Sequence, residues 1–140
     1  MANEMLFGDA HVERYRATDG AEGHEWRGGT HCLLLTTTGR SSGQPRTAAL
    51  IYGRHGADLL VVASKGGSDQ APAWYLNLEA DPKVEVQVGA DVFPAIARTA
   101  TPQEKAALWP IMVAEWPDYD VYATKTTRDI PVVVLERAAD

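Results

Sequence analysis

Short apolar runs separated by turn residues recur along the chain, and their lengths predict strands more often than helices. Residues 31–38 are rich in leucine and threonine and lead into a glycine-containing turn, which is typical of a hairpin strand. Residues 46–53 and 58–64 predict the next two strands, joined around His55-Gly56. We therefore expect an antiparallel meander in which consecutive strands pair.

The second half of the chain continues this pattern. Valines alternate with Glu85 and Gln87 over residues 84–88, the period of two expected for a strand with one solvated face. A second strand over 92–98 follows a glycine turn, and the apolar run 130–135 predicts the last strand. The sequence thus predicts about six antiparallel strands, most of them linked by hairpins.

Two or three short helices interrupt these strands. Residues 9–17 and 72–78 predict two of them. The third, over 101–115, has a strong start, because Thr101 can cap the helix, a proline follows, and Glu104 can reach back to the cap. Strands and helices together indicate a mainly β, α+β fold with a small barrel-like sheet.

The length of 140 residues suits one compact domain, 1–140, and no internal repeat or linker-like segment divides it. We expect residues 1–28 to supply an N-terminal helix and connector, and residues 31–136 to form the barrel. One hydrophobic core then serves the whole chain, so any functional site lies on the surface of that core.

The overall charge is acidic, with 13 Lys and Arg against 19 Asp and Glu and a net charge of −6. This balance argues against a nucleic-acid binder that works by bulk positive charge. The charge is uneven, however: residues 39–78 carry a net +2, and the remaining residues carry −8. This basic island points to a small anionic ligand.

The single cysteine, Cys32, cannot form an internal disulfide and stands in an apolar run, so we expect a buried thiol in a reducing compartment. The first residues lack the features of a signal peptide. No segment approaches the roughly 20 apolar residues of a membrane span. We expect a cytoplasmic protein, and a loose contact of Met5-Leu6-Phe7 with the inner face of the membrane stays open.

Several common chemistries are excluded by what the sequence lacks. Its four histidines have no metal-ligand spacing and no cysteine pair assists them, so no metal site is expected. No histidine follows Ser64, which excludes a serine hydrolase of the nucleophile-elbow type. The glycine-rich nicotinamide and P-loop motifs are also absent. An enzyme with this sequence would therefore depend on a bound organic cofactor.

The turn over 39–46 combines two arginines, two serines and two glycines, and such a loop can hold a phosphate or carboxylate. Lys65 follows the strand 58–64. In a meander of neighbouring strands, Lys65 and Arg46 lie at the same end of the sheet and could converge on one anion. Arg54 lies at the opposite end and is expected in solvent. The alternative for this turn is a hairpin tip with solvated charges.

Residues 116–122 contain one tryptophan and two tyrosines, which could form the wall of a site for a planar ligand. The alternative is that these rings cover the core from outside. Trp74 and Trp109 are more typical of core positions. The His-Glu-Trp patch at residues 24–26 has no assigned role.

Several motifs stand in order along residues 31–136. They lie at 35–46, 63–67, 74–78, 81–84, 109–110, 116–122 and 128–133. Together they resemble the deazaflavin-dependent nitroreductase family. The resemblance implies a split β-barrel, like that of FMN-binding proteins, that binds coenzyme F420, an 8-hydroxy-5-deazaflavin with a phospholactyl and polyglutamyl tail. It also implies that the reduced coenzyme delivers a hydride from C5 to an electrophile.

The same resemblance assigns residues to the site. Tyr119 is the first choice for orienting the acceptor and donating a proton, and Ser64 is the second. The acceptor wall is Trp116, Tyr119 and Tyr122. The cofactor residues are Arg40, Ser41, Ser42, Arg46, Thr47, Ala48, Ala49, Leu50, Ile51, Val62, Ala63, Ser64, Lys65, Ala73, Trp74, Tyr75, Leu76 and Asn77. The departures from the family pattern, which leave the acceptor open, are Ser41, Ala49, Ile51 and Trp116.

The function expected from the sequence is that of an F420H2-dependent oxidoreductase acting on a quinone, an enone or a nitro compound. One alternative is an FMN-dependent reductase of the same fold, because a single phosphate could also use Arg40, Arg46 and Lys65. Another is a carrier that holds F420 or an apolar ligand without turnover. The expected partner is a small electrophile and no nucleic acid, with the protein a monomer or homodimer.

Overall fold

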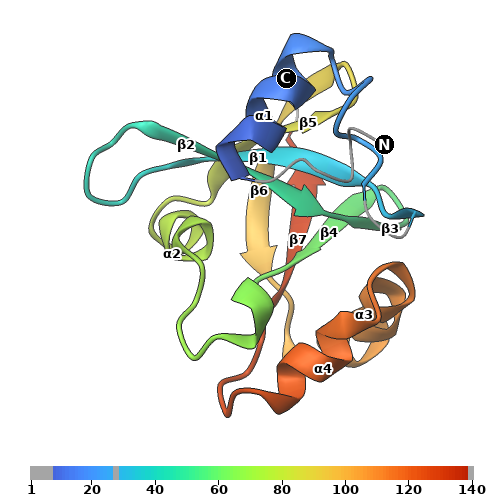
Figure 1. Cartoon of the computed structure of the whole chain (residues 1–140). Coiled ribbons are helices and arrows are strands. Elements are labelled where there is room, and N and C mark those ends of the chain that lie inside the picture. The colour runs from blue at the N-terminus through green and yellow to red at the C-terminus, as the bar shows by residue number, and fades with distance from the viewer. Residues whose placement is uncertain (1–7, 27–28, 139–140) are drawn as a thin grey trace.

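The computed structural model describes residues 8–26 and 29–138, so Met5-Leu6-Phe7 lies outside the described residues. A curled antiparallel sheet of seven strands runs in the order β2-β1-β5-β6-β7-β4-β3 (Figure 1). The strands are β1 (Cys32–Thr38), β2 (Pro45–Ile51), β3 (Gly53–His55), β4 (Asp58–Val62), β5 (Lys83–Val88), β6 (Asp91–Thr99) and β7 (Val132–Arg137). The helices are α1 (Gly8–Ala17), α2 (Ala73–Ala80), α3 (Pro102–Glu115) and α4 (Asp118–Thr124), with a 3-10 turn η3 (Lys65–Gly67).

The mixed α+β, barrel-like class predicted from the sequence is confirmed. The predicted start of α3 is also confirmed, because Thr101 Oγ1 accepts the Glu104 N–H at 3.1 Å and the Glu104 carboxylate accepts the Thr101 N–H at 2.9 Å. A helix that the sequence did not indicate, α4, lies within the aromatic segment 116–122 and its continuation. This short helix sets the direction of the tyrosines.

The two faces of the sheet pack against different helices, which explains the continuous apolar run in β7. Val133 and Leu135 belong to the core cluster that includes Tyr75 and Leu78 of α2. Val132 and Val134 alternate with them and belong to the cluster with α3 and α4. Figure 1 shows α3 and α4 at the opposite end of the molecule from α1. A strand buried on both faces needs apolar residues at every position.

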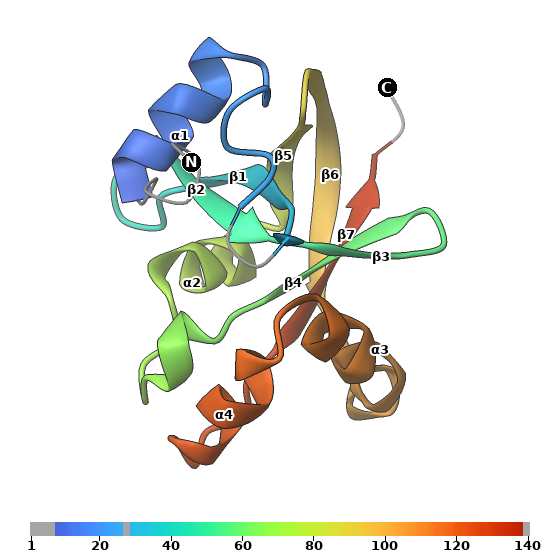
Figure 2. The same ribbon diagram turned by 45° about the vertical axis from the view of Figure 1, so that its right-hand side comes forward.

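The expected meander is wrong between residues 46 and 64. β1 pairs with β2, and β3 pairs with β4, but β2 and β4 stand near opposite edges of the sheet. The predicted strand 46–53 is broken at Tyr52, where its N–H donates to the His31 carbonyl at 3.1 Å. The chain therefore leaves one edge strand and enters the other within one residue, which gives a seventh strand and curls the sheet toward closure (Figure 2).

Tyr15 joins α1 to the sheet through its buried hydroxyl. That hydroxyl donates to the Cys32 carbonyl at 3.0 Å, with the Gln87 carbonyl at 3.3 Å, and accepts the Gly89 N–H at 2.8 Å. Burial raises the pKa of Tyr15 to about 12. A single side chain thus connects the helix, β1 and the turn between β5 and β6.

No helix among the described residues is long and apolar enough to cross a membrane.

The Tyr15→Phe variant should lose about 1–3 kcal/mol of unfolding free energy, because the part-buried Gly89 N–H and the buried Cys32 carbonyl lose their partner. Urea denaturation at pH 7 measures this loss. Unfolded tyrosine ionises near pH 10 while folded Tyr15 ionises near 12, so wild-type stability should also fall as the pH rises above 10. A smaller dependence is expected in the variant. A loss below about 0.5 kcal/mol would mean that the hydroxyl contributes nothing beyond the ring.

Candidate functional site

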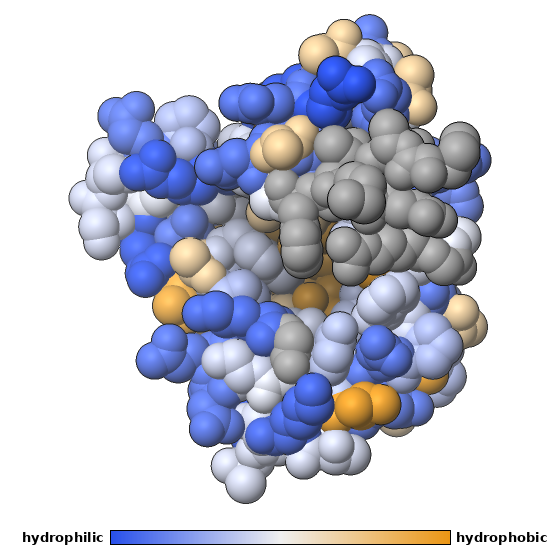
Figure 3. All heavy atoms as spheres, viewed as in Figure 1, coloured by the Kyte–Doolittle hydropathy of each residue, from blue (hydrophilic) through white to orange (hydrophobic). Residues whose placement is uncertain are grey.

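Two adjoining cavities lie along strand β2. Thr47 and Ala48 line one of them, Ala49 to Ile51 line the other, and Trp74 of α2 lines both. Their volumes are about 370 and 230 Å³, respectively. Figure 3 shows hydrophobic residues at the bottom of a hollow near the centre of one face. A ligand that occupied both cavities would run parallel to β2.

The larger cavity is here called the basic cavity. Its lining is Gly39, Arg40, Ser41, Ser42, Arg46, Thr47, Ala48, Ala73, Trp74 and Asn77. The smaller one is called the aromatic cavity. Its lining is Gly8, His11, Trp26, Cys32, Ala49, Leu50, Ile51, Val62, Ser64, Lys65, Trp74, Trp116, Tyr119 and Tyr122.

The turn between β1 and β2 builds one side of the basic cavity. The Gly39 N–H donates to the Gln44 carbonyl at 2.8 Å, and the Gly43 N–H donates to the Gly39 carbonyl at the same distance. A Cβ at Gly39 would lie 2.6 Å from Ser42 Oγ and 3.1 Å from the Gln44 carbonyl oxygen, so a side chain there would displace the Ser42 hydroxyl. The tight turn keeps the Arg40 and Arg46 side chains exposed at the cavity, and no described carboxylate pairs with either. Their charges therefore suit an anionic ligand.

Asn77 fixes the position of Arg40. Its carbonyl oxygen Oδ1 accepts from Arg40 Nη1 at 3.0 Å and from the Arg40 backbone N–H at 3.2 Å. Its Nδ2 donates to Thr37 Oγ1 at 3.1 Å. Asn77 is 4% exposed, so this amide connects α2 to the turn from a buried position. Asn77 thus orients the guanidinium group of Arg40, and both the oxygen and the nitrogen of its own carboxamide already have hydrogen-bond partners.

Ser64 and Lys65 follow β4 and border the aromatic cavity. Lys65 adopts φ +46°, a left-handed conformation that is uncommon outside glycine. This turn brings the buried Ser64 and the exposed Lys65 side chain to the same cavity.

The strand pairing from which we expected Arg46 and Lys65 to converge does not exist, because β2 and β4 are not neighbours in the sheet. The two cations instead line adjoining cavities that share Trp74. The exposed side chain of Arg54 lies in β3 and lines neither of these two cavities.

The aromatic wall comes from α4 and the residue before it. Tyr119 is 5% exposed, and its ring lies edge-on to that of Tyr122 with centroids 6.0 Å apart. Trp116 Nε1 donates to the Tyr122 hydroxyl at 3.2 Å. The described part of the chain offers the Tyr119 hydroxyl no hydrogen-bond partner, and burial raises the pKa of Tyr119. Tyr119 therefore remains a protonated donor at neutral pH.

The N-terminal segment contributes residues that the sequence did not predict for the site. Trp26 lies 6.0 Å from Trp116 between ring centroids, and His11 stacks on Trp26 at 6.1 Å. The buried His11 holds its segment by an Nε2 hydrogen bond to the Gly23 carbonyl at 2.8 Å. The His-Glu-Trp patch at residues 24–26 was the feature of the sequence that could have indicated this contribution. The contact between Trp26 and Trp116 could not be predicted because the two residues lie far apart in the sequence.

Three residues of the predicted cofactor set, Ala63, Tyr75 and Leu76, line neither cavity. Ala63 is fully buried, and the Tyr75 hydroxyl bonds Thr99 Oγ1 at 2.7 Å beside a different cavity. For Tyr75 and Leu76 the reason is helix geometry. Ala73 and Asn77, four residues apart, share the face of α2 toward the basic cavity, and the two residues between them do not. All other predicted cofactor and acceptor residues line one of the two cavities.

The two cavities suit a molecule with a planar ring and an anionic chain. The aromatic cavity offers the small and branched side chains of β2 beside Trp74, and the basic cavity offers two guanidinium groups and two serine hydroxyls. Among the described residues, no group of three or more His, Cys, Asp or Glu side chains could hold a metal ion. The chemistry of these side chains alone supplies proton donors and an anion site.

The sequence matches the family model described as F420H(2)-dependent quinone reductase over residues 9–137. It is 45% identical over 130 residues to the F420H(2)-dependent quinone reductase Rv1261c of Mycobacterium tuberculosis (strain ATCC 25618 / H37Rv), covering 91% of this chain and 87% of that protein.

Two solved structures share the fold. One, described as a domain-swapped dimer, has a TM-score of 0.73 and 38% identity, covering 89% of this chain and 93% of that one. Another, described as an F420-H2 dependent reductase (FDR-A), has a TM-score of 0.70 and 40% identity, covering 75% of this chain and 93% of that one. The curled sheet is the split barrel of FMN-binding-like proteins.

Proposed function

The chain belongs to the F420H(2)-dependent quinone reductase family, and from this we propose that it is an oxidoreductase that reduces a quinone or a related electrophile with F420H2. The observation that carries the proposal is the placement of the two adjoining cavities along β2, with Trp74 lining both. One cavity suits a planar ring and the other suits an anionic tail. Both ends of F420 therefore have a matching environment.

The basic cavity is the proposed site of the anionic tail. Arg40 is held by Asn77, and Arg46 stands beside Thr47 on β2. The Ser41 and Ser42 hydroxyls add neutral donors to the same lining. Guanidinium groups that no described carboxylate neutralises keep their charge for a phosphate or glutamate group.

The aromatic cavity is the proposed site of the deazaflavin ring and the acceptor. Ala49, Leu50 and Ile51 present small and aliphatic side chains against a flat ring. Trp26, Trp116 and Tyr122 add aromatic rings to the lining, which suits a flat acceptor such as a quinone. When bound, reduced F420 supplies the hydride. The enclosing rings also exclude water from the reacting atoms.

Tyr119 is the proposed proton donor. Addition of a hydride to a quinone leaves negative charge on an oxygen. A hydroxyl positioned beside that oxygen stabilises the charge and so lowers the activation barrier of hydride transfer. The Tyr119 hydroxyl has no described hydrogen-bond partner, and burial raises the pKa of Tyr119 still further above neutral pH. The Ser64 hydroxyl, in the same lining, is the second candidate.

Two measurements test the function. Fluorescence titration of the apo protein should show binding of oxidised F420 in preference to FMN, and F420H2 absorbance should decay when menadione is added. Tight FMN binding without F420 binding would replace the proposal by a flavin reductase of the same fold. Binding of F420 without any decay, over a panel of quinones, enones and nitro compounds, would indicate a carrier.

Arg46→Ala should weaken F420 binding by about tenfold at low salt, because it removes one charge-assisted contact. The loss should grow with the number of glutamates in the tail. Lys65→Ala should weaken binding to a similar degree but independently of tail length, since Lys65 lines the other cavity. Arg137→Ala removes a cation paired with Asp91 and away from both cavities, and serves as the charge control. Unchanged affinity in Arg46→Ala would move the tail to another surface, and unchanged affinity in Lys65→Ala would remove Lys65 from the cofactor site.

Tyr119→Phe should lower kcat about 100-fold and change F420 affinity less than twofold, since only the hydroxyl is removed. Stopped-flow oxidation of F420H2 measures the rate. Because burial raises the pKa of Tyr119, the wild-type rate should not decline between pH 7 and 10 through loss of this proton. If Tyr119→Phe keeps the full rate while Ser64→Ala loses it, the serine is the donor.

A further inference from the structure

The backbone that carries Ser64 and Lys65 is held by one side chain from a distant part of the chain, Arg128. Arg128 Nε donates to the Ser68 carbonyl at 2.6 Å. Its Nη2 donates to the Ser64 carbonyl at 2.8 Å and the Ala63 carbonyl at 3.1 Å. The turn at η3 directs these three carbonyls toward one point, where a single guanidinium group bonds them all.

The conformation that brings the carbonyls together is an unfavourable one. Lys65 has φ +46°, while Ser64 before it is right-handed helical and Ser68 after it is extended. The Gly67 N–H donates back to the Ser64 carbonyl at 2.9 Å, and the Ser68 N–H to the Lys65 carbonyl at 3.1 Å. These two short-range bonds close the turn, and the Arg128 bonds fix it from outside.

Further contacts connect the same two segments. The Ala63 N–H donates to the Pro131 carbonyl at 3.0 Å, and the Thr126 hydroxyl donates to Asp69 Oδ1 at 2.5 Å. Gly67 packs against the backbone of α4, since a Cβ there would lie 2.8 Å from the Tyr122 carbonyl oxygen. These contacts therefore fix the position of the turn that carries Ser64 and Lys65 relative to α4, which carries the tyrosines.

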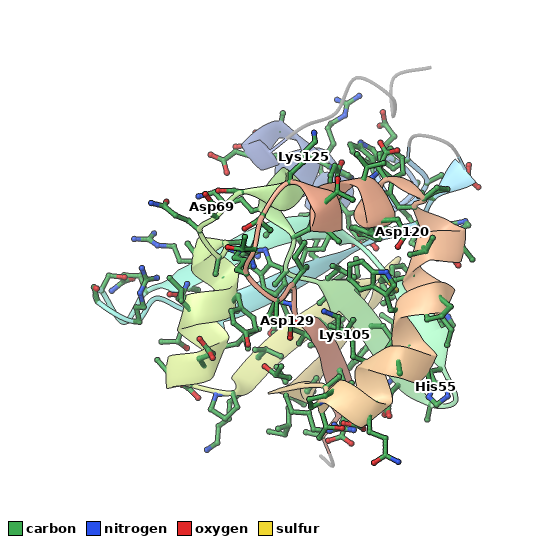
Figure 4. All side chains as sticks on the ribbon, turned by 90° about the horizontal axis from the view of Figure 1, so that it is seen from below. His55, Asp69, Lys105, Asp120, Lys125 and Asp129 are labelled. Carbon is green, nitrogen blue, oxygen red and sulfur yellow. The ribbon has the colours of Figure 1, made fainter. Side chains whose placement is uncertain are left out.

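We propose that Arg128 is a positioning residue, which holds the backbone of residues 63–68 so that Ser64 and Lys65 face the aromatic cavity. This role rests on the proposed function in so far as that cavity holds F420 and its acceptor. Arg128 lines neither the aromatic nor the basic cavity, so it acts through Ser64 and Lys65. Its acceptors are neutral carbonyls, and the nearby Asp129 is bonded to Lys105 at 2.6 Å instead (Figure 4).

The first test uses the apo protein and needs no cofactor. In Arg128→Met, the Gly67 and Ser68 amides should exchange hydrogen at least about tenfold faster, because the Ser64 carbonyl that accepts the Gly67 N–H loses its outside donor and the turn that the Ser68 N–H also closes is released. Amides of β1 should be unchanged. Lys105→Met is the matched control, because it breaks the adjoining Lys105–Asp129 pair and leaves the three carbonyls bonded. Equal exchange in Arg128→Met and the wild type overturns the proposal.

The second test is a double-mutant cycle on F420 affinity. Arg128→Met should weaken binding about tenfold, and Lys65→Ala should then add less than twofold in that background, because Lys65 is already displaced. Full additivity of the two losses overturns the proposal. If wild-type protein does not bind F420, the proposed function fails, while the exchange test still decides the role of Arg128. Where Arg128→Met does not fold, Arg128→Lys is measured in both tests and should give smaller losses of the same kind, since the ammonium keeps the charge but lacks the planar fork with which Nε and Nη2 reach separate carbonyls.

Discussion

The passage of the chain through Tyr52 is the constraint on which the site depends. The Tyr52 N–H bonds the His31 carbonyl beside the start of β1, and the next residue already begins β3. Two strands near opposite ends of the sheet order are thereby joined by a single residue, and the sheet must curl. This curl brings Ala49 to Ile51 of β2 and Val62 at the end of β4 to one cavity. A sheet with the predicted meander would have no such cavity between its edges.

Features that depend on residues close together in the sequence could be predicted, whereas features that depend on contacts between distant residues could not. The start of α3 could be predicted because a threonine, a proline and Glu104 act within one helical turn. The basic turn could be predicted because its arginines and serines all lie within residues 40–46. The break at Tyr52 could not, because the bond that fixes it reaches back to His31. Trp26 was missed for the same reason, since its neighbour in space is Trp116.

Arg40 and Arg128 are both held by neutral oxygen atoms. Asn77 supplies a carboxamide to Arg40, and three backbone carbonyls serve Arg128. The consequences differ with exposure. Arg40 is exposed at a cavity, where its charge can meet a ligand. Arg128 is half-buried, and its N–H groups donate to backbone carbonyls. An acidic protein can in this way present a local anion site without competing carboxylates.

Trp26 and Trp116 line one side of the aromatic cavity, where we propose that the acceptor binds, and they come from outside the regular strands. The opposite side is formed by β2, whose backbone is tied residue by residue to β1. Replacing Trp26 or Trp116 alters the shape of the aromatic cavity without disturbing the hydrogen bonds between strands. A change in β2, by contrast, alters the barrel itself. The fold therefore allows relatives to diverge in the molecules they reduce while they keep the same source of electrons.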